Sequence, residues 1–178
     1  MLDVIESICF SEEEIAKIIE KLGKEITNDY KGKDPLIIGL LKGCIPFMTD
    51  LVKKIDTDLT LDYMKVSSYS GTESTGNVKV DGAIPDVKNR HVIIVDDILD
   101  TGRTLKAVSE LIMNQGALSV ELCALFDKPL GRKVDITPKY VGGIVPNAFI
   151  VGYGLDYNEH YRNLPYIGVL QKEVYISK

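Results

Sequence analysis

The sequence predicts an α/β fold whose central sheet is mainly parallel, twisted and flanked by helices. Residues 92–95 form a short, β-branched and entirely apolar run, which is typical of a parallel strand buried on both faces. A second apolar run is Leu36–Leu41, and a further strand is expected at 120–126. Segments with apolar residues at helical spacing lie between these strands, and this alternation favours an open sheet covered by helices.

The first element with clear boundary signals is a helix at Glu12–Tyr30. Ser11 and Glu14 have the spacing of a capping box, in which each side chain bonds to the backbone N–H group of the other residue. The apolar residues that follow form one stripe, as in a helix that packs on a core: Ile15, Ile18, Ile19, Leu22 and Ile26. This helix precedes the buried strand Leu36–Leu41.

The later elements continue the alternation of helices and strands. Pro46 suits the start of a second helix that extends to Ile55. Thr104 lies at the start of a third helix, and Gly116 fits its C-terminus. The expected strands after the first are, in order, 59–66, 92–95, 120–126 and short strands near Val141, Phe149, Ile167 and Val174.

Composition indicates one compact domain, 1–178. The 178 residues, of which 45% are hydrophobic, suffice for one substantial core but not for two. The formal net charge of -5 argues against a surface for generic nucleic-acid binding, and no apolar run is long enough to span a membrane. Cys9, Cys44 and Cys123 are odd in number and widely spaced, which favours reduced thiols and a cytoplasmic location. We therefore expect neither nucleic acid nor a membrane among the partners.

The most informative segment follows the strand at 92–95. Asp96 and Asp97 are adjacent carboxylates at its carboxyl end, where open α/β sheets bind ligands. Two such carboxylates can accept hydrogen bonds from both hydroxyls of a ribose, or can bind the Mg²⁺ that accompanies a pyrophosphate. Because a phosphate alone would not require them, the pattern indicates a ribose-phosphate ligand, with either the ribose hydroxyls or a Mg²⁺ cofactor at the two carboxylates.

A phosphate-binding turn follows directly. Asp100, Thr101, Gly102, Arg103 and Thr104 connect the strand to a helix, and the N–H groups of such a turn and of a helix N-terminus can hold phosphate oxygens. Asp100 comes just before the turn and is therefore expected near the reacting carbon of the sugar, where it can accept a proton from an incoming base. The alternative, a strand that simply ends in solvated acids, does not account for the turn.

Other acidic and phosphate motifs match less well. Gly152 and Gly154 lack the third glycine of a dinucleotide-binding loop, and no P-loop with its lysine occurs. An acidic pocket of the response-regulator type would need several strands between Asp97 and Lys128, where this chain has room for about one strand and one helix.

Several motifs resemble one enzyme family. The segment 96–104 resembles the motif for 5-phosphoribosyl-1-pyrophosphate (PRPP) of the type I phosphoribosyltransferases. Further segments resemble the hypoxanthine-guanine branch of that family: Leu41-Lys42-Gly43, Ser68-Tyr69 ahead of Ser74-Thr75-Gly76, Asp127-Lys128, and 149–159. Asp96 departs from the pattern, because many relatives carry Glu there. The shorter side chain would reach the ribose or the metal through water.

The resemblance implies the type I phosphoribosyltransferase fold, with a small hood over the base site. The hood would consist of about 149–178 together with the N-terminus. The long polar connection at about 67–82 contains glycines and would be a lid, with Ser68 and Tyr69 facing the ligand. An ordinary hairpin tip is the alternative.

The resemblance also assigns ligand contacts. The pyrophosphate ligands would be Lys42, Gly43 and Arg162, with a cis peptide before Lys42. The Mg²⁺ ligands would be Asp96, Asp97 and Asp156. The purine pocket would contain Ile98, Lys128, Phe149, Ile150 and Asp156. Taken singly, Lys42 would be interpreted as a solvated surface lysine and Phe149 as an ordinary core aromatic, and only the resemblance assigns them to the site.

Together these residues predict an enzyme of purine salvage. It would transfer the 5-phosphoribosyl group from PRPP to N9 of hypoxanthine or guanine, giving IMP or GMP and pyrophosphate. Lys128 favours 6-oxopurines, because a lysine can donate to the exocyclic O6 but cannot accept from the amine of adenine. The alternatives are a xanthine-preferring enzyme, or a non-catalytic PRPP-sensing or RNA-binding regulator on the same fold. Relatives form dimers and tetramers, so a homodimer or homotetramer is expected.

Overall fold

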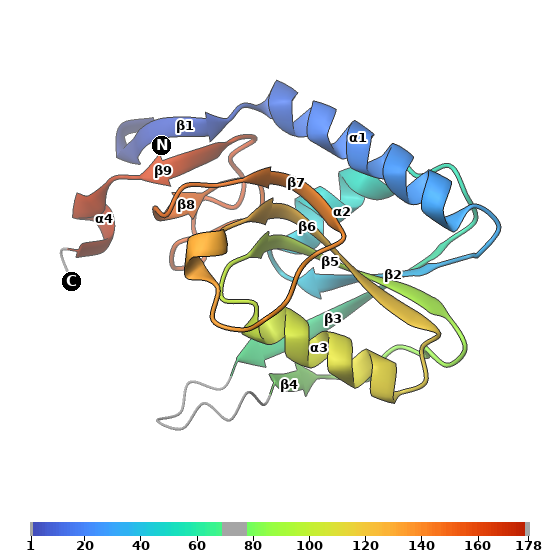
Figure 1. The fold of residues 1–178 in the computed structure, drawn as a ribbon. Coiled ribbons are helices and arrows are strands. Elements are labelled where there is room, and N and C mark those ends of the chain that lie inside the picture. The colour runs from blue at the N-terminus through green and yellow to red at the C-terminus, as the bar shows by residue number, and fades with distance from the viewer. Residues whose placement is uncertain (1, 69–77, 177–178) are drawn as a thin grey trace.

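The computed structural model describes residues 2–68 and 78–176, which form two β-sheets and the helices around them (Figure 1). None of the helices in these two ranges is long and apolar enough to cross a membrane. In chain order the elements are η1 Leu2–Val4, β1 Ile5–Phe10, α1 Glu12–Tyr30, β2 Leu36–Leu41, α2 Cys44–Val52, β3 Thr60–Ser68, β4 Val78–Asp81, β5 His91–Leu99, α3 Arg103–Asn114, β6 Ser119–Asp127, η2 Pro129–Gly131, β7 Tyr140–Ile144, β8 Ile150–Val151, β9 Ile167–Leu170 and α4 Lys172–Ile176.

The central sheet has the strand order β4-β3-β2-β5-β6-β7. Neighbouring strands run parallel, except that β4 is antiparallel to β3. The two innermost strands, β2 and β5, are buried along most of their length, as expected for strands covered on both faces. The predicted mainly parallel sheet is confirmed.

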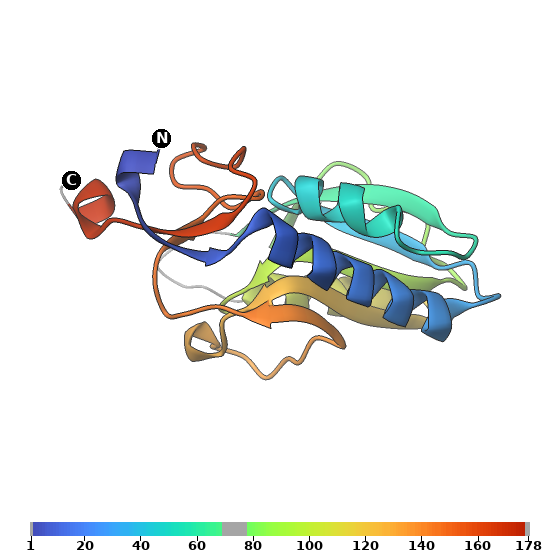
Figure 2. The same cartoon turned by 90° about the horizontal axis from the view of Figure 1, so that it is seen from above.

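Helices cover both faces of this sheet, with α1 and α2 on one side and α3 on the other (Figure 1), and Figure 2 looks onto the face that α1 and α2 cover. On one face, Ile19 of α1 and Phe47 of α2 belong to the same buried cluster as Ile93 of β5. On the other face, Val108 of α3 belongs to a second buried cluster with Ile94. Because successive side chains of a strand point to opposite faces, β5 contributes to both cores and is held between them.

A second, antiparallel sheet, β1-β9-β8, lies at one end of the molecule together with both chain termini (Figure 1). It combines N-terminal and C-terminal residues and corresponds to the predicted hood. Ile150 and Ile167 of this sheet belong to the same core cluster as α1 and α2. Phe10 at the end of β1 packs against Phe126 of β6, with ring centroids 4.7 Å apart. The hood therefore shares a core with the central sheet.

The helix boundaries agree closely with the sequence signals. α1 has the predicted bounds, and its capping box is formed by Ser11 and Glu14. α3 begins at Arg103, one residue before the predicted start. α2 begins at Cys44, before Pro46, and ends at Val52, so that the helix is shorter than the predicted one.

The predicted strand near Val174 is wrong, because this segment is the short helix α4. The N–H group of Val174 donates to the carbonyl of Gln171 at 3.1 Å and closes a helical turn. A short apolar run does not distinguish a strand from a helix by its periodicity. Strand β1 was not predicted, because exposed Glu6 and Ser7 interrupt its apolar pattern.

The predicted lid at about 67–82 falls largely outside the described residues. Tyr69 lies outside them, and Ser68 is the last described residue of β3. The described residues on either side of it belong to β3 and β4, which pair with each other. The lid itself stays a prediction.

Replacing Ser11 with Ala should lower the free energy of unfolding by about 1 kcal/mol, the usual effect of losing a helix N-cap. The variant lacks the hydroxyl that accepts the backbone N–H of Glu14 at 3.3 Å. Urea denaturation followed by circular dichroism measures the change. Ser109→Ala, inside α3, is the matched control and should not destabilise the protein, because alanine favours helix interiors. An equal loss in both variants would contradict the role of the cap.

Candidate active site

Two adjacent carboxylates lie near the carboxyl end of β5. Asp97 is only 8% exposed, and Asp96 is partly buried. The N–H group of Asp97 donates to Asp96 Oδ1 at 3.1 Å, and the N–H group of Ile98 donates to Asp97 Oδ1 at 2.8 Å. Burial raises the pKa of both carboxyls, and the charge of Asp97 raises the pKa of Asp96 further. The pair therefore favours a ligand that brings hydrogen-bond donors or positive charge.

Gly43 places the loop after β2 directly against this pair. A Cβ atom at Gly43 would overlap Asp97 Oδ2, so no side chain fits at this position. The peptide between Leu41 and Lys42 is cis, as the family resemblance implied. A loop of the hood packs on the same segment, because a Cβ atom at Gly154 would overlap the carbonyl of Gly43. The backbone around Gly43 is thus enclosed between the carboxylates and the hood.

The predicted phosphate turn has the geometry of an anion site. Gly102 has a φ of +79°, a conformation that favours glycine, and α3 begins at the next residue. A Cβ atom at Gly102 would also overlap the side chain of Ile136, so both conformation and space require glycine. The N–H groups in the first turn of an α-helix have no carbonyl partners within the helix, so a helix N-terminus can bind an anion. In α3 the N–H group of Arg103 donates to Thr101 Oγ1 at 3.4 Å.

A pocket of about 260 Å³ joins the carboxylates to the turn. The predicted site residues in its lining are Gly43, Asp96, Asp97, Ile98, Asp100, Thr101, Gly102 and Thr104. The structure thus brings together most of the residues predicted to bind ribose and the 5-phosphate.

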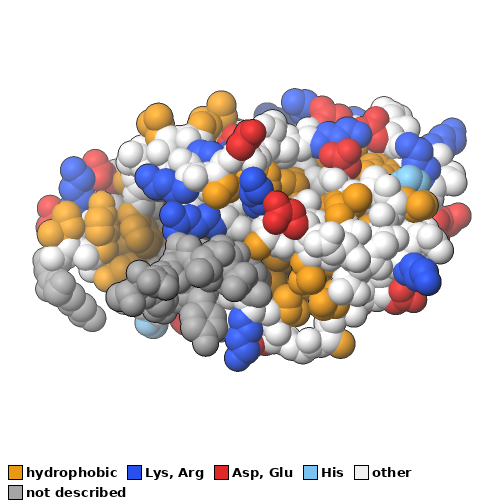
Figure 3. Space-filling model, turned by 60° about the horizontal axis from the view of Figure 1, so that its bottom comes forward, with side chains coloured by type: hydrophobic (Ala, Val, Ile, Leu, Met, Phe, Trp, Pro, Cys, Tyr) orange, Lys and Arg blue, Asp and Glu red, His pale blue; other side chains and the backbone are white. Residues whose placement is uncertain are grey.

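Basic side chains gather locally although the net charge of the chain is -5. On the face shown in Figure 3, several Lys and Arg side chains lie close together to the left of the centre. A phosphorylated ligand requires only such a local concentration of positive charge.

Lys128 lies beside the pocket, next to Asp100. Its Nζ is 3.8 Å from Asp100 Oδ2 and donates to the carbonyl of Ala148 at 3.1 Å. The backbone N–H of Lys128 donates to the carbonyl of Leu99 at 3.0 Å, which fixes the end of β6 against the end of β5. The predicted base-recognition lysine and the predicted catalytic carboxylate are therefore neighbours.

Phe149 belongs to an aromatic group in the hood. Its ring is stacked on Tyr175 of α4 with centroids 5.1 Å apart, and it meets Tyr157 edge-on at 5.5 Å. The residue remains 37% exposed, which leaves part of the ring accessible to a ligand. Ile150 is buried in β8.

Arg132 is a site residue that sequence reasoning missed. Its guanidinium donates to the carbonyls of Leu99 at 3.3 Å and Asp100 at 3.0 Å, and pairs with the carboxylate of Asp127. The side chain is largely buried. Arg132 therefore connects the end of β5, which carries Asp100, to the end of β6. No local motif predicts these contacts of Arg132, because they depend on how an irregular loop packs.

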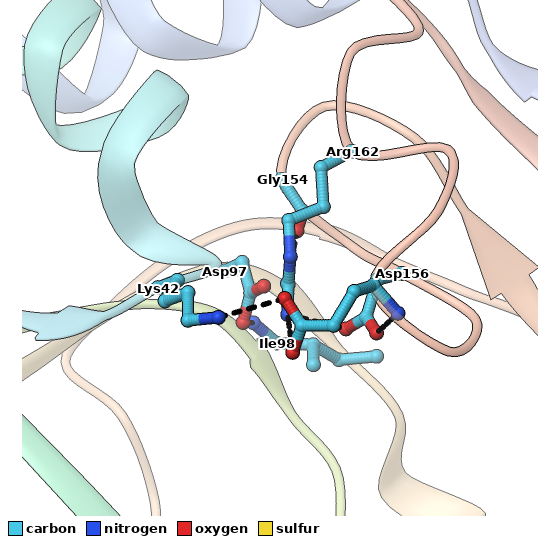
Figure 4. A network of polar contacts seen from close by, with 7 residues as sticks. Lys42, Asp97, Ile98, Gly154, Asp156 and Arg162 are labelled. Atoms are coloured by element: carbon cyan, nitrogen blue, oxygen red, sulfur yellow. Dashed lines mark hydrogen bonds and ion pairs between the residues drawn. The ribbon is translucent and has the colours of Figure 1, made fainter.

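A network of charges links the loop after β2 to the hood (Figure 4). Arg162 pairs with Asp156 Oδ1 at 2.8 Å and donates to the carbonyl of Gly154 at 2.7 Å. Lys42 Nζ pairs with Glu159 Oε2 at 2.8 Å. The second oxygen of Glu159 lies 3.4 Å from Arg162. The structure thus joins the predicted pyrophosphate ligands Lys42 and Arg162 through Glu159, which sequence reasoning did not single out.

The acidic pair does not form a complete metal cage. Within residues 2–68 and 78–176, no group of three or more His, Cys, Asp or Glu side chains could hold a metal ion. Asp156 is therefore not brought into one cluster with Asp96 and Asp97, and its carboxylate pairs with Arg162 instead. A link between Asp156 and a metal stays a prediction.

The sequence itself identifies the family. Residues 10–158 match the family model of the phosphoribosyl transferase domain. The chain belongs to the phosphoribosyl transferase family. The hypoxanthine-guanine phosphoribosyltransferase of Streptococcus pneumoniae strain R6 is 52% identical over 174 residues, which cover 96% of each protein. The bifunctional protein TilS/HprT of Listeria monocytogenes is 51% identical over 173 residues, and the chain spans 27% of its length.

Solved structures of phosphoribosyl transferases confirm the fold. A hypoxanthine phosphoribosyltransferase from Staphylococcus aureus has a TM-score of 0.95 and 49% identity, covering 98% of this chain and 96% of that chain. A hypoxanthine phosphoribosyl transferase from Trypanosoma cruzi has a TM-score of 0.93 and 36% identity, covering 99% of this chain and 97% of that chain. The predicted type I fold and the hypoxanthine-guanine branch are thereby confirmed.

Replacing Asp96 with Asn should raise the free energy of unfolding of the ligand-free protein by roughly 1 kcal/mol at neutral pH. Burial and the charge of Asp97 raise the pKa of Asp96, so its ionised form destabilises the folded chain. As the pH falls through this raised pKa toward the ordinary carboxyl value of about 4, the wild-type residue becomes protonated and the difference should shrink.

Urea denaturation of both proteins across this pH range measures the difference. The exposed residue Asp58 provides the control, because Asp58→Asn should leave the free energy of unfolding unchanged. A variant that is less stable than wild type at neutral pH would contradict the destabilising role of the Asp96 charge.

Proposed function

We propose that the chain transfers the 5-phosphoribosyl group from PRPP to N9 of hypoxanthine or guanine, giving IMP or GMP and pyrophosphate. The observation that carries this proposal is the position of Asp100. This carboxylate lines the pocket with the acidic pair and the phosphate turn, and lies 3.8 Å from Lys128. The predicted sugar, phosphate and base subsites therefore meet at one carboxylate, as a transfer between sugar and base requires.

Each part of PRPP has a matching group of residues. The turn formed by Asp100, Thr101, Gly102, Arg103 and Thr104 holds the 5-phosphate. Asp96 and Asp97 accept the ribose hydroxyls, directly or through water. Lys42, Arg162 and the backbone at Gly43 bind the pyrophosphate. Ser68, the last residue of β3, and the following residue Tyr69 are proposed to face the ligand. Anchoring both ends of the substrate orients the anomeric carbon toward the base.

The 6-oxopurine is proposed to bind between the pocket and the hood. Lys128 donates to O6, Phe149 stacks on the ring, and Ile98 provides an apolar surface. Ile150 and Asp156 contribute backbone groups. The exposed part of Phe149 and the short distance from Lys128 to Asp100 support this placement.

The acidic pair fits a divalent cation. Asp97 is buried and Asp96 partly buried, and both have raised pKa values, so their negative charge is incompletely balanced by the protein. Two carboxylates together with water and substrate oxygens are the usual surroundings of Mg²⁺ in phosphoryl and pyrophosphate sites. We propose that Asp96 and Asp97 hold Mg²⁺, with Asp156 linked to it. When bound, Mg²⁺ supplies positive charge that favours departure of pyrophosphate.

The side chains of the chain account for the remaining steps. As the bond between the anomeric carbon and pyrophosphate lengthens, the sugar gains oxocarbenium character and the leaving group gains negative charge. Lys42 and Arg162 stabilise that charge. The purine attacks through N9 while Asp100 accepts or holds the proton at N7. No covalent enzyme intermediate is required.

We further propose that residues 1–178 act as one domain, in the cytoplasm, as part of a homodimer or homotetramer. The shared core of the hood and the central sheet supports a single domain. Large apolar side chains on β3 and α2 are exposed, including Leu61, Tyr63 and Ile45, and burial between copies would remove them from water.

Turnover with separate purines tests the reaction. Pyrophosphate release from PRPP and Mg²⁺ should occur with hypoxanthine and guanine and be absent with adenine and uracil, because Lys128 offers only donors at position 6. Faster turnover of xanthine would make the chain a xanthine-preferring enzyme. PRPP binding without turnover of any base would overturn the catalytic proposal and leave a regulator on the same fold.

Asp100→Asn should lower kcat by about a hundredfold or more, because the amide cannot accept the N7 proton, and removal of a general base usually costs 10²- to 10⁴-fold. PRPP affinity should stay close to that of wild type, since the turn supplies its phosphate contacts from the backbone. Steady-state kinetics and equilibrium PRPP binding measure both quantities. Asp58→Asn serves as the control for a carboxylate outside the pocket. A kcat equal to that of wild type would contradict the role of Asp100.

A further inference from the structure

One carboxylate contacts both of the cations assigned to pyrophosphate. Glu159 Oε2 accepts a hydrogen bond from Lys42 Nζ at 2.8 Å, and Glu159 Oε1 lies 3.4 Å from Arg162 Nη2. Lys42 comes from the loop after β2, whereas Arg162 comes from the hood (Figure 4). The side chain of Glu159 therefore lies where a bridging anion would lie between the two.

The backbone fixes this position of Glu159. Asn158 and Glu159 have φ angles of +49° and +67°, a region that side-chain-bearing residues seldom adopt. The turn is closed by paired backbone hydrogen bonds between Tyr157 and His160, at 3.1 and 3.0 Å. In addition, the N–H group of Glu159 donates to Asp156 Oδ2 at 2.9 Å. The turn thus presents the Glu159 carboxylate toward Lys42 by its own construction.

The contacts of Glu159 are easily exchanged, but the anchors of Arg162 are not. The side chains of Lys42 and Glu159 are 55% and 63% exposed, and ion pairs between exposed side chains contribute little stability. By contrast, Arg162 and Asp156 are only 26% and 29% exposed and pair at 2.8 Å, and Arg162 also donates to Gly154. If Glu159 moves away, Arg162 stays in place while Lys42 becomes free.

We propose that Glu159 is an intramolecular competitor of pyrophosphate: it pairs with Lys42 and Arg162 in the ligand-free site and gives them up to the pyrophosphate group of the substrate. This proposal rests on the proposed function, since it takes these two cations as the pyrophosphate ligands. Pyrophosphate carries several negative charges and displaces a single carboxylate from an exposed pair. After transfer, Glu159 recaptures the cations and speeds the departure of the product. The Glu159 carboxylate thus lowers the affinity for pyrophosphate and raises the rate at which pyrophosphate leaves.

The test is binding of magnesium pyrophosphate to the full chain by calorimetry, with PRPP and hypoxanthine turnover measured in parallel. Glu159→Gln should lower the dissociation constant by about threefold, the effect expected for one exposed ion pair. The rate at which pyrophosphate dissociates from this variant should fall by a similar factor, because affinity changes within one site are mostly changes in the dissociation rate. Glu159→Asp keeps the charge but withdraws it from Lys42, and should also bind pyrophosphate more tightly than wild type.

The matched control is Glu20→Gln. Glu20 pairs with Lys24 on α1 at 2.8 Å, the distance found for Glu159 and Lys42, and both side chains of this pair are likewise exposed. This variant should bind pyrophosphate as wild type does.

The outcomes separate this inference from the proposed function. If the wild-type chain turns over PRPP and hypoxanthine but Glu159→Gln binds pyrophosphate no more tightly than wild type, only this inference is overturned. If Glu159→Gln binds pyrophosphate more tightly but Glu159→Asp binds it as wild type does, the effect is due to net charge. That result also overturns the inference. Absence of turnover in the wild-type chain overturns the proposed function, and the inference with it.

Discussion

The structure depends on one constraint. It must hold two carboxylates, Asp96 and Asp97, side by side near the end of the buried strand β5. Burial and mutual repulsion both disfavour the ionised pair Asp96 and Asp97, so the surrounding chain must hold them by packing. Strand β5 achieves this because its side chains belong to two separate cores, one under α1 and α2 and one under α3. Gly43 leaves room for the pair, and Arg162 supplies positive charge toward Asp97. Natural active sites often sacrifice stability in this way to keep a reactive arrangement.

The architecture around that strand was largely predictable from the sequence, because buried parallel strands leave nearly continuous apolar runs. Strands β2 and β5 are of this kind, whereas helix α1 was predictable from its capping box and its single apolar stripe. The hood was harder to read from periodicity, since β1 has exposed Glu6 and Ser7 and β8 is only two residues long. Its presence was expected only from the resemblance of 149–159 to a known family. The helix at α4 was mistaken for a strand, because so short a segment has no readable period.

The site residues also fall into those that a local sequence pattern predicts and those that it does not. Residues of the turn at 100–104 were predicted because they are contiguous and carry a recognisable local geometry. Arg132 and Glu159 were not predicted, because they belong to no contiguous motif. Each is an ordinary charged residue in a loop, and its importance arises from partners distant in the sequence: the carbonyl of Leu99 for Arg132, and Lys42 for Glu159. Such contacts are products of tertiary packing, and neither composition nor spacing encodes them.

The pairing of β1 with β9 gives the order in which the molecule can be completed during synthesis. Ile5 lies opposite Leu170 and Phe10 opposite Ile167, so β1 has no partner strand until Ile167–Leu170 has been synthesised. At roughly 5–20 residues per second, β1 remains without its neighbour for about ten to thirty seconds. All strands of the central sheet lie between β1 and β9 in the sequence, so they are synthesised before the β1-β9-β8 sheet can be completed. The nascent chain therefore contains all the residues that line the pocket at the end of β5 before it contains the complete second sheet.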